Sequence, residues 1–281
     1  MSESENKILR NEDLDNDLLH EGYVVTSFLS PEQITHLKKF FESHHPQKLE
    51  GFYASAHTAD TDFRKKMNDE IKSVFSAPIE RTFINCTPLG GSFVVKANKN
   101  SDILQPHQDW NIVDEENYRS FNIWVPLVDL TEENGAIMVL PKSHRWLKNF
   151  RGPNIPDQFD DKKEQLLKKM RTLKMKAGEA LIYDHRLFHS SHANTSNQLR
   201  IAAVFGIIPK AAEMFYYFGK EDKVEVYKSS VDFFMEGNIQ KGPEILEKVK
   251  EVNNKEIVFN NKQLHDEAFS LSFMDKIRSF F

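Results

Sequence analysis

Hydrophobic residues follow a helical spacing in the first part of the chain, up to Pro78. The clearest helix start is Ser30-Pro31-Glu32-Gln33, where a serine N-cap, a proline at the first helical position and a capping-box glutamine precede an apolar stripe. A second amphipathic helix is expected over Thr61–Phe75, ending before Pro78 because proline interrupts the helical hydrogen bonds. Ahead of both, Leu18–Val25 predicts a short helix followed by a strand.

After Pro78 the pattern changes to short strands separated by turns. Strands are expected at Thr82–Thr87 and Ser92–Ala97, with a turn at Pro88-Leu89-Gly90-Gly91 between them. A hairpin turn is expected at Glu133-Asn134-Gly135. Further strands are predicted at Ser120–Leu130, Ala136–Leu140, Ala180–Tyr183 and Leu199–Ile208. Together these segments predict a mainly β core.

Two long segments lie outside this strand pattern. Residues 142–176 form a charged insertion with a predicted helix over Asp160–Met170, and we interpret it as a lid because long insertions between strands are usually functional. Residues 211–281 form a C-terminal extension, and the chain 1–281 is interpreted as one domain with its core at about 18–210. Phenylalanines of the extension could serve core packing, a dimer contact or an acyl pocket. They are Phe233, Phe234, Phe259, Phe269, Phe273, Phe280 and Phe281.

Composition and charge narrow the classes of function. The formal net charge of −5 gives no support for nucleic-acid binding, and no apolar run is long enough to span a bilayer. A single cysteine, Cys86, excludes an internal disulfide, and the polar N-terminal segment lacks the apolar region of a signal peptide. A cytoplasmic protein with a small-molecule partner is therefore expected, and the composition does not indicate its oligomeric state.

The first candidate for chemistry is His107-Gln108-Asp109. In an extended segment, residues two apart project from the same face, so one strand edge can offer an imidazole and a carboxylate to one metal ion. A third ligand would come from the histidines that follow the strand Ala180–Tyr183. These are His185, His189 and His192. Two histidines and one carboxylate form the facial triad that binds non-haem Fe(II) and leaves coordination positions open.

The second candidate is Arg200, which stands in the otherwise apolar run Leu199–Ile208. A buried guanidinium left without a partner is costly. Two explanations remain open from the residues alone: a salt bridge to a nearby acid, or binding of a ligand carboxylate by the planar fork of the arginine. Lys96 is a weaker candidate for the same role, since a lysine on a strand is usually solvated.

The order and spacing of these motifs resemble the phytanoyl-CoA dioxygenase (PhyH-like) family of Fe(II)- and 2-oxoglutarate-dependent oxygenases. The resemblance runs from about Leu18 to about Pro209. Its motifs are His107-x-Asp109, the Trp124 strand, Glu133-Asn134-Gly135 with Pro141-x-Ser143-His144, and Gly178-Glu179 leading to His189-x-Ser191-x-x-Asn194-x-Ser196-x-x-x-Arg200. The chain has Lys142 where the family normally has glycine, a departure that concerns loop shape. The resemblance implies a double-stranded β-helix, the cupin-like jelly roll, with helices packed outside.

The resemblance also implies roles for single residues. His107, Asp109 and His189 would be the iron ligands, which chooses His189 among the three histidines. Arg200 would bind the distal carboxylate of 2-oxoglutarate, and Ser191 and Trp124 would line the pocket of that co-substrate. Four further residues flank the metal motif and are candidates for contact with the primary substrate: Trp110, Asn111, Arg119 and Asn122.

The implied reaction is hydroxylation of an unactivated C–H bond by O2, with decarboxylation of 2-oxoglutarate to succinate and CO2. The expected substrate is a small organic molecule such as an amino acid, a carrier-linked acid or an acyl compound. A halogenase would have a small residue at Asp109, and a non-catalytic jelly-roll binding protein would lack the triad, so the filled triad argues against both. Desaturation and ring closure at the same site remain alternatives.

Overall fold

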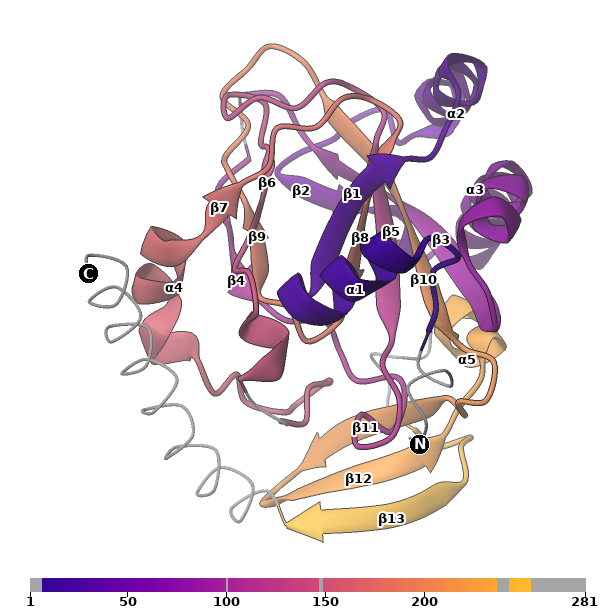
Figure 1. Ribbon diagram of the computed structural model, residues 1–281, viewed down its shortest axis with the longest axis vertical. Helices are drawn as coiled ribbons and strands as arrows, with labels where there is room; N and C mark the ends of the chain where they lie inside the picture. Colours follow the sequence, from indigo (N-terminus) through magenta and orange to yellow (C-terminus); the bar gives the residue numbers. More distant parts are fainter. Residues whose placement is uncertain (1–6, 100, 147–148, 237–242, 254–281) are drawn as a thin grey trace.

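Two antiparallel β-sheets form the centre of the computed structural model, which describes residues 7–99, 101–146, 149–236 and 243–253 (Figure 1). The larger sheet has the strand order β1 (Tyr23–Ser27), β8 (Glu179–Asp184), β5 (Phe121–Pro126), β10 (Arg200–Pro209), β3 (Cys86–Lys96) and β2 (Phe52–Ala54). The smaller sheet has the order β4 (Leu104–His107), β9 (His189–Ser191), β6 (Ile137–Val139) and β7 (Arg171–Thr172). One cluster of buried side chains joins Trp124 and Leu181 of the larger sheet to Ile137 and Val139 of the smaller one. The predicted mainly β, jelly-roll architecture is confirmed.

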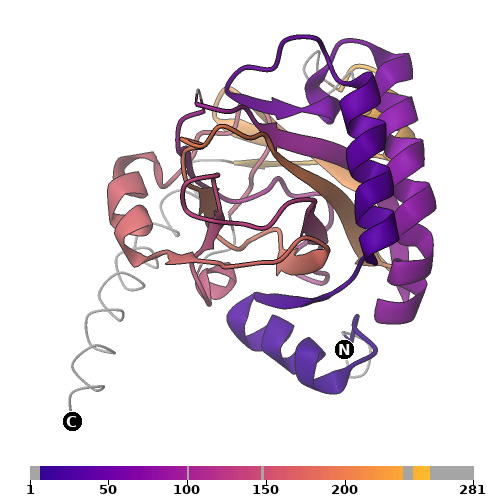
Figure 2. The same cartoon turned by 90° about the horizontal axis from the view of Figure 1, so that it is seen from above.

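Two helices, α2 (Pro31–His44) and α3 (Thr61–Thr82), cover the outer face of the larger sheet, as Figure 2 shows from above. A third helix, α1 (Glu12–Glu21), lies apart from them, next to the edge strand β1. The predicted capping box at Ser30 is present: its side chain accepts from the Gln33 N–H, and the Gln33 side chain accepts from the Ser30 N–H. Phe41 of α2 and Phe75 of α3 are buried in the cluster that contains Phe93 and Phe205 of the sheet. These helices thus close the core on the side away from the smaller sheet.

The prediction that the second helix ends before Pro78 is wrong, because α3 continues to Thr82 with Pro78 inside it. A proline in a helix interior loses one backbone hydrogen bond and costs roughly 3 kcal/mol. Pro78 and Ile79 are both buried. Burial of this last turn against the core offsets the cost, which a local sequence signal does not report.

The predicted pair of strands around Pro88-Leu89-Gly90-Gly91 is also wrong, since β3 runs through this segment as one strand. The two glycines serve a close approach of α3 instead of a turn. A Cβ atom on Gly91 would lie 2.7 Å from Cγ2 of Ile71, and the Gly91 N–H donates to Asn68 at 2.8 Å. β3 is nevertheless irregular at this point, because its pairing register with β10 shifts between Phe205 and Ile207.

The turn at Glu133-Asn134-Gly135 is present, but it does not form a hairpin, because β5 and β6 on either side of it belong to different sheets. Segment 142–176 contains a short helix, α4 (Lys163–Lys169), where a helix was predicted, and supplies β7 to the smaller sheet. The same segment has two 3-10 turns, η3 (Ser143–Arg145) and η4 (Asp160–Lys162), and a further one, η2 (Ser55–His57), lies between β2 and α3. Lys142, which replaces the family's glycine, has a φ of 69°, so the left-handed backbone is kept without glycine.

The C-terminal extension adds a third sheet of β11 (Phe215–Lys220), β12 (Lys223–Lys228) and β13 (Lys248–Asn253), with α5 (Val231–Glu236). Phe233 and Phe234 pack against Tyr216, with ring centroids 5.0 and 6.2 Å away, so these two phenylalanines serve core packing. The other five phenylalanines considered for these roles, Phe259, Phe269, Phe273, Phe280 and Phe281, lie outside the described residues. Within the described ranges, every helix is too short or too polar to cross a membrane.

Candidate metal and co-substrate site

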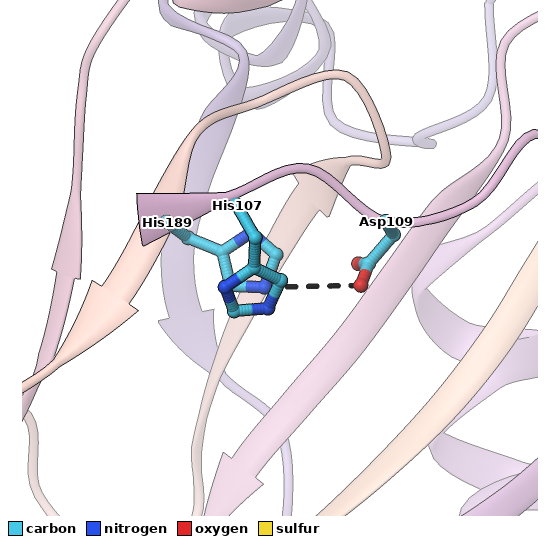
Figure 3. A group of neighbouring side chains, drawn as sticks. All are labelled: His107, Asp109 and His189. Carbon is cyan, nitrogen blue, oxygen red and sulfur yellow. Dashed lines mark ion pairs between the residues drawn. The ribbon is translucent and has the colours of Figure 1, made fainter. Parts of the chain in front are cut away.

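The structure brings His107, Asp109 and His189 together between the two sheets (Figure 3). His107 at the end of β4 is in direct register with His189 at the start of β9, and their ring centroids are 4.2 Å apart. Asp109 follows β4, and its Oδ1 lies 3.8 Å from Nε2 of His189. One ligand atom from each residue falls within 4.8 Å of the others. This is the spacing that three ligands of one metal ion require.

Backbone hydrogen bonds set the orientation of the two imidazoles. Nδ1 of His107 lies 2.8 Å from the Gln105 carbonyl, and Nδ1 of His189 lies 3.1 Å from the Leu187 carbonyl. A carbonyl only accepts, so each Nδ1 carries the proton and donates it. Each Nε2 therefore presents a lone pair, which is the arrangement found in metal-ligating histidines.

The two oxygens of Asp109 have different surroundings. Oδ2 accepts a 2.8 Å hydrogen bond from the Asn122 amide, which also lies 3.4 Å from the Tyr183 hydroxyl. Burial favours the neutral acid, but the neighbouring imidazoles of His189, His185 and His107 outweigh it and lower the pKa of Asp109 to about 2. Oδ1 is thus the oxygen of the ionised carboxylate that remains for a cation.

Burial, and to a smaller extent the nearby His189, lower the pKa of His107 to about 4 against the opposing effect of Asp109. At neutral pH the ring of His107 is therefore neutral. Metal ligands have to be deprotonated, so a neutral imidazole beside an ionised carboxylate is ready to bind a divalent cation without losing a proton.

The other histidines have partners away from the triad. His185 Nδ1 lies 3.0 Å from the Ser120 hydroxyl, and His192 Nε2 lies 2.8 Å from the Thr172 hydroxyl. His144, at the end of the family motif, is buried with its Nε2 3.1 Å from the Leu19 carbonyl. The geometry thus groups His189, and neither His185 nor His192, with the His-x-Asp motif.

A cavity of about 150 Å³ opens beside the triad. Its walls come from both sheets. Besides the triad, the lining residues are Phe52, Val94, Leu104, Asn122, Trp124, Ile137, Tyr183, Ser190, Ser191, Arg200 and Val204. A cavity of this size can hold a small organic molecule.

Arg200 is the one lining residue of this cavity with a cationic side chain at neutral pH. It is 2% exposed, and its Nε and Nη1 have no hydrogen-bond partner within the described part of the chain. Burial lowers its pKa to about 10, which still leaves the guanidinium charged at neutral pH. Its Cζ lies 5.3 Å from the centroid of the Trp124 ring, and the buried Ser191 hydroxyl also lacks a partner. A carboxylate fits these free donors.

Lys96, in register with Arg200 on the neighbouring strand, is already engaged. It is fully buried, and its ammonium group donates to the carbonyls of Asp102, Ser191 and His192. Burial, assisted by the charge of Arg200, lowers the pKa of Lys96 to about 7. Its bonds to Ser191 and His192 tie β3 to β9, and it does not line the cavity.

Of the four residues predicted to contact the substrate, Asn122 lines the cavity and the other three do not. Arg119 donates to Asp184 at 2.7 Å and to the Leu18 carbonyl at 3.2 Å. Asn111 is buried and accepts from the Arg151 N–H at 2.5 Å, and Trp110 is 40% exposed. Arg119 and Asn111 thus already have protein partners, whereas the Trp110 side chain faces solvent in part.

Several lining residues were missed from the sequence. Val204 could have been found, since it lies four residues after Arg200 on the same strand and therefore on the same face. Tyr183 could not, because its place depends on the register of β8 with Asn122 on β5. The same holds for Phe52 and Ile137, which come from two different sheets.

The residues present fit iron and an organic acid, since imidazole and carboxylate ligands suit Fe(II) and the free guanidinium suits a carboxylate. A jelly roll that holds a two-histidine, one-carboxylate triad is the architecture of non-haem iron oxygenases that use 2-oxoglutarate. The sequence pattern of the phytanoyl-CoA dioxygenase (PhyH) family matches residues 19–202, and this chain belongs to that family. The resemblance noted from the motifs is thus confirmed.

One curated protein and several solved structures are similar to this chain. Dioxygenase trt7 of Aspergillus terreus (strain NIH 2624 / FGSC A1156) is 28% identical over 128 residues, which are 43% of this chain. The chain spans 41% of the length of this curated relative. The non-heme alpha ketoglutarate dependent carbocyclase SnoK has a TM-score of 0.52 at 17% identity, covering 73% of this chain and 86% of that chain.

Two further solved structures have the same fold. The epimerase SnoN in complex with Fe3+, alpha ketoglutarate and nogalamycin RO has a TM-score of 0.53 at 18% identity, covering 72% of this chain and 85% of that chain. EctD from S. alaskensis with 2-oxoglutarate and 5-hydroxyectoine has a TM-score of 0.51 at 17% identity, covering 73% and 78%. At these identities the likeness shows the shared fold.

Proposed function

We propose that this protein is an Fe(II)- and 2-oxoglutarate-dependent dioxygenase that hydroxylates an unactivated C–H bond of a small organic molecule. One observation carries the proposal: the unpartnered guanidinium of Arg200 lies in the wall of the same cavity as the triad. A metal triad alone would fit many enzymes. A triad that shares its cavity with a free buried cation fits an enzyme whose co-substrate is an acid that also reaches the metal.

His107, Asp109 and His189 would hold the iron through two Nε2 atoms and one carboxylate oxygen. Iron in this position supplies the activation of O2, coupled to conversion of 2-oxoglutarate to succinate and CO2. The Asn122 amide keeps Oδ2 of Asp109 occupied, so the carboxylate presents one oxygen. The chain thus sets which atoms face the metal before any ligand arrives.

Arg200 and Ser191 would bind the distal carboxylate of 2-oxoglutarate, since both have free donors in the cavity wall. The Trp124 ring lies against the guanidinium and shields it from water. In such a low-dielectric setting a charge-assisted pair is strong, and its geometry orients the co-substrate toward the triad.

The rest of the cavity wall is largely apolar, with Val94, Leu104, Ile137 and Val204 among its residues. An apolar wall limits access of water to the reacting atoms and suits a carbon-rich reacting end of the substrate. This fits an amino acid, a carrier-linked acid or an acyl compound equally. Asn122 is the substrate candidate that the cavity retains.

The test is turnover of substrate pools with Fe(II), ascorbate and 2-oxoglutarate, followed by succinate analysis and mass spectrometry. The proposal expects succinate formation coupled to a product that has gained one oxygen atom. A product that has lost two hydrogens would replace hydroxylation by desaturation or ring closure. Absence of succinate with every pool, together with absence of Fe(II) binding, would contradict the proposal.

A further inference from the structure

Asp109 lies beyond the end of β4, so sheet hydrogen bonds do not fix its backbone. Two other bonds do. Its N–H donates to the His185 carbonyl at 2.9 Å, and its carbonyl accepts a 2.6 Å hydrogen bond from Nε of Arg151. Asp109 is thus held on one side by the segment that leads into β9, and on the other by a side chain from segment 142–176.

Arg151 is bound to the residues around Asp109 at several points. Its backbone pairs with Asn111: the Asn111 N–H donates to the Arg151 carbonyl at 3.1 Å, and the Arg151 N–H donates to the Asn111 side chain at 2.5 Å. Two residues earlier, the Asn149 amide donates to the Gln108 side chain at 3.3 Å. This part of segment 142–176 is therefore packed onto the metal motif.

Glu115 fixes the guanidinium of Arg151. Its two oxygens accept from Nη1 at 3.1 Å and Nη2 at 2.6 Å, and both side chains are more than nine-tenths buried. A bidentate pair of this kind restricts the arginine to one orientation. Nε is then aimed at the Asp109 carbonyl, and Nη1 also reaches the Asn149 carbonyl at 2.9 Å.

The C-terminal sheet supports the same region from outside. The Tyr217 hydroxyl donates to the Val113 carbonyl at 3.0 Å, and the Tyr217 ring stacks on Phe150 at 5.3 Å. A Cβ atom on Gly152 would lie 2.2 Å from the Tyr217 carbonyl oxygen, so the two backbones are in close contact. The third sheet therefore braces the segment that carries Arg151.

From these contacts we infer that Arg151 and Glu115 are positioning residues that set the backbone of Asp109 and, through it, the metal affinity of the triad. The inference rests on the proposed function. Neither side chain lines the cavity. They act through the Asp109 carbonyl, in the way that residues hydrogen-bonded to metal ligands tune the ligands they orient.

The test is anaerobic Fe(II) binding by equilibrium dialysis, with thermal melting of the metal-free protein measured in parallel. Arg151→Lys keeps the charge but cannot bond Glu115 and the Asp109 carbonyl together. Arg81→Lys is the matched control, because Arg81 also donates to a backbone carbonyl, that of Phe28, at 2.8 Å and does not line the cavity. We expect Arg151→Lys to weaken Fe(II) binding about 10- to 100-fold and Arg81→Lys to leave it unchanged.

Glu115→Gln is the second variant, which keeps the size of the side chain and removes its charge. It should weaken Fe(II) binding in the same direction, so the inference stays testable if Arg151→Lys does not fold. Variants that melt at a lower temperature but bind Fe(II) like wild type would assign the pair to stability alone and overturn the inference. Failure of the wild-type protein to bind Fe(II) would instead overturn the proposed function.

Discussion

Two buried arginines, in different regions of the molecule, differ in their hydrogen-bond partners. Arg151, in segment 142–176, donates to both oxygens of Glu115 and to two backbone carbonyls. Arg200, in the cavity wall, has two nitrogens with no partner in the described parts of the chain. Both are at most 8% exposed, so solvent does not explain the difference.

On the proposed function, the difference separates a side chain that serves the fold from one that would bind a ligand. A buried charge without a partner costs stability, and folding gives no reason to keep it. A buried pair, once formed, becomes costly to break. His189 and His192 differ in a similar way, since Nε2 of His189 faces Asp109 and Nε2 of His192 lies 2.8 Å from the Thr172 hydroxyl.

The largest expected effect is on metal binding. His189→Ala should abolish Fe(II) binding, lowering the affinity by at least about 100-fold, because two remaining ligands rarely hold a first-row metal against water. His192→Ala, three residues further along the chain, is the control and should bind Fe(II) like wild type. Iron content after anaerobic dialysis measures both, and metal loss in His192→Ala with retention in His189→Ala would reverse the assignment.

The next effect concerns stability and tests the two arginines directly. Arg151→Ala leaves Glu115 buried without its partner, so urea unfolding of the metal-free protein should show a loss of about 3–5 kcal/mol. Arg200→Ala removes a charge that has no partner to lose, so the free energy of unfolding should stay the same or rise. Equal losses in the two variants would remove the distinction between them.

A smaller effect concerns His144, which is buried outside the cavity. Burial lowers its pKa to about 4 against the opposing effect of Asp184. Its ordinary value is 6.5, so between pH 6.5 and 4 the unfolded chain takes up a proton that the folded protein refuses. The contribution of neutral His144 to the free energy of unfolding is therefore fully present above pH 6.5 and is lost as the pH falls toward 4.

His144→Gln should make the loss between pH 7 and pH 4.5 smaller, by up to about 3 kcal/mol. Urea unfolding at both pH values measures it, with His20→Gln as the control because His20 is exposed. An unchanged pH dependence in His144→Gln would show that another group causes the loss.

Local sequence signals predicted those parts of the fold in which short-range physics decides. The capping box at Ser30 is one example, because all its atoms lie within four residues. The predictions at Pro78 and Gly90-Gly91 were wrong for a shared reason. A proline often ends a helix and a glycine pair often forms a turn, but here both are packed against residues distant in sequence, and the local sequence looks the same in either case. Only the packing of α3 on β3 distinguishes them.

The residues of the site also fall into those that local sequence signals predicted and those that they did not. His107 and Asp109 are two residues apart, and Arg200 stands out in an apolar strand, so both were visible in the sequence. The choice of His189 needed the family resemblance, and the structure shows the reason: it depends on the register between β4 and β9. The contact of Arg151 with Asp109 spans forty-two residues and has no local signal.

The most direct test of the account is the binding of two keto acids to the Fe(II)-loaded protein, measured by calorimetry without oxygen. Pyruvate lacks the distal carboxylate that Arg200 is proposed to bind, whereas 2-oxoglutarate has it. Wild type should prefer 2-oxoglutarate by about 30-fold or more, as expected for a charge-assisted pair whose loss costs roughly 2–5 kcal/mol. Arg200→Ala should bind both acids with similar, weak affinity. A preference that survives in Arg200→Ala, or one that is absent from wild type, would contradict the account.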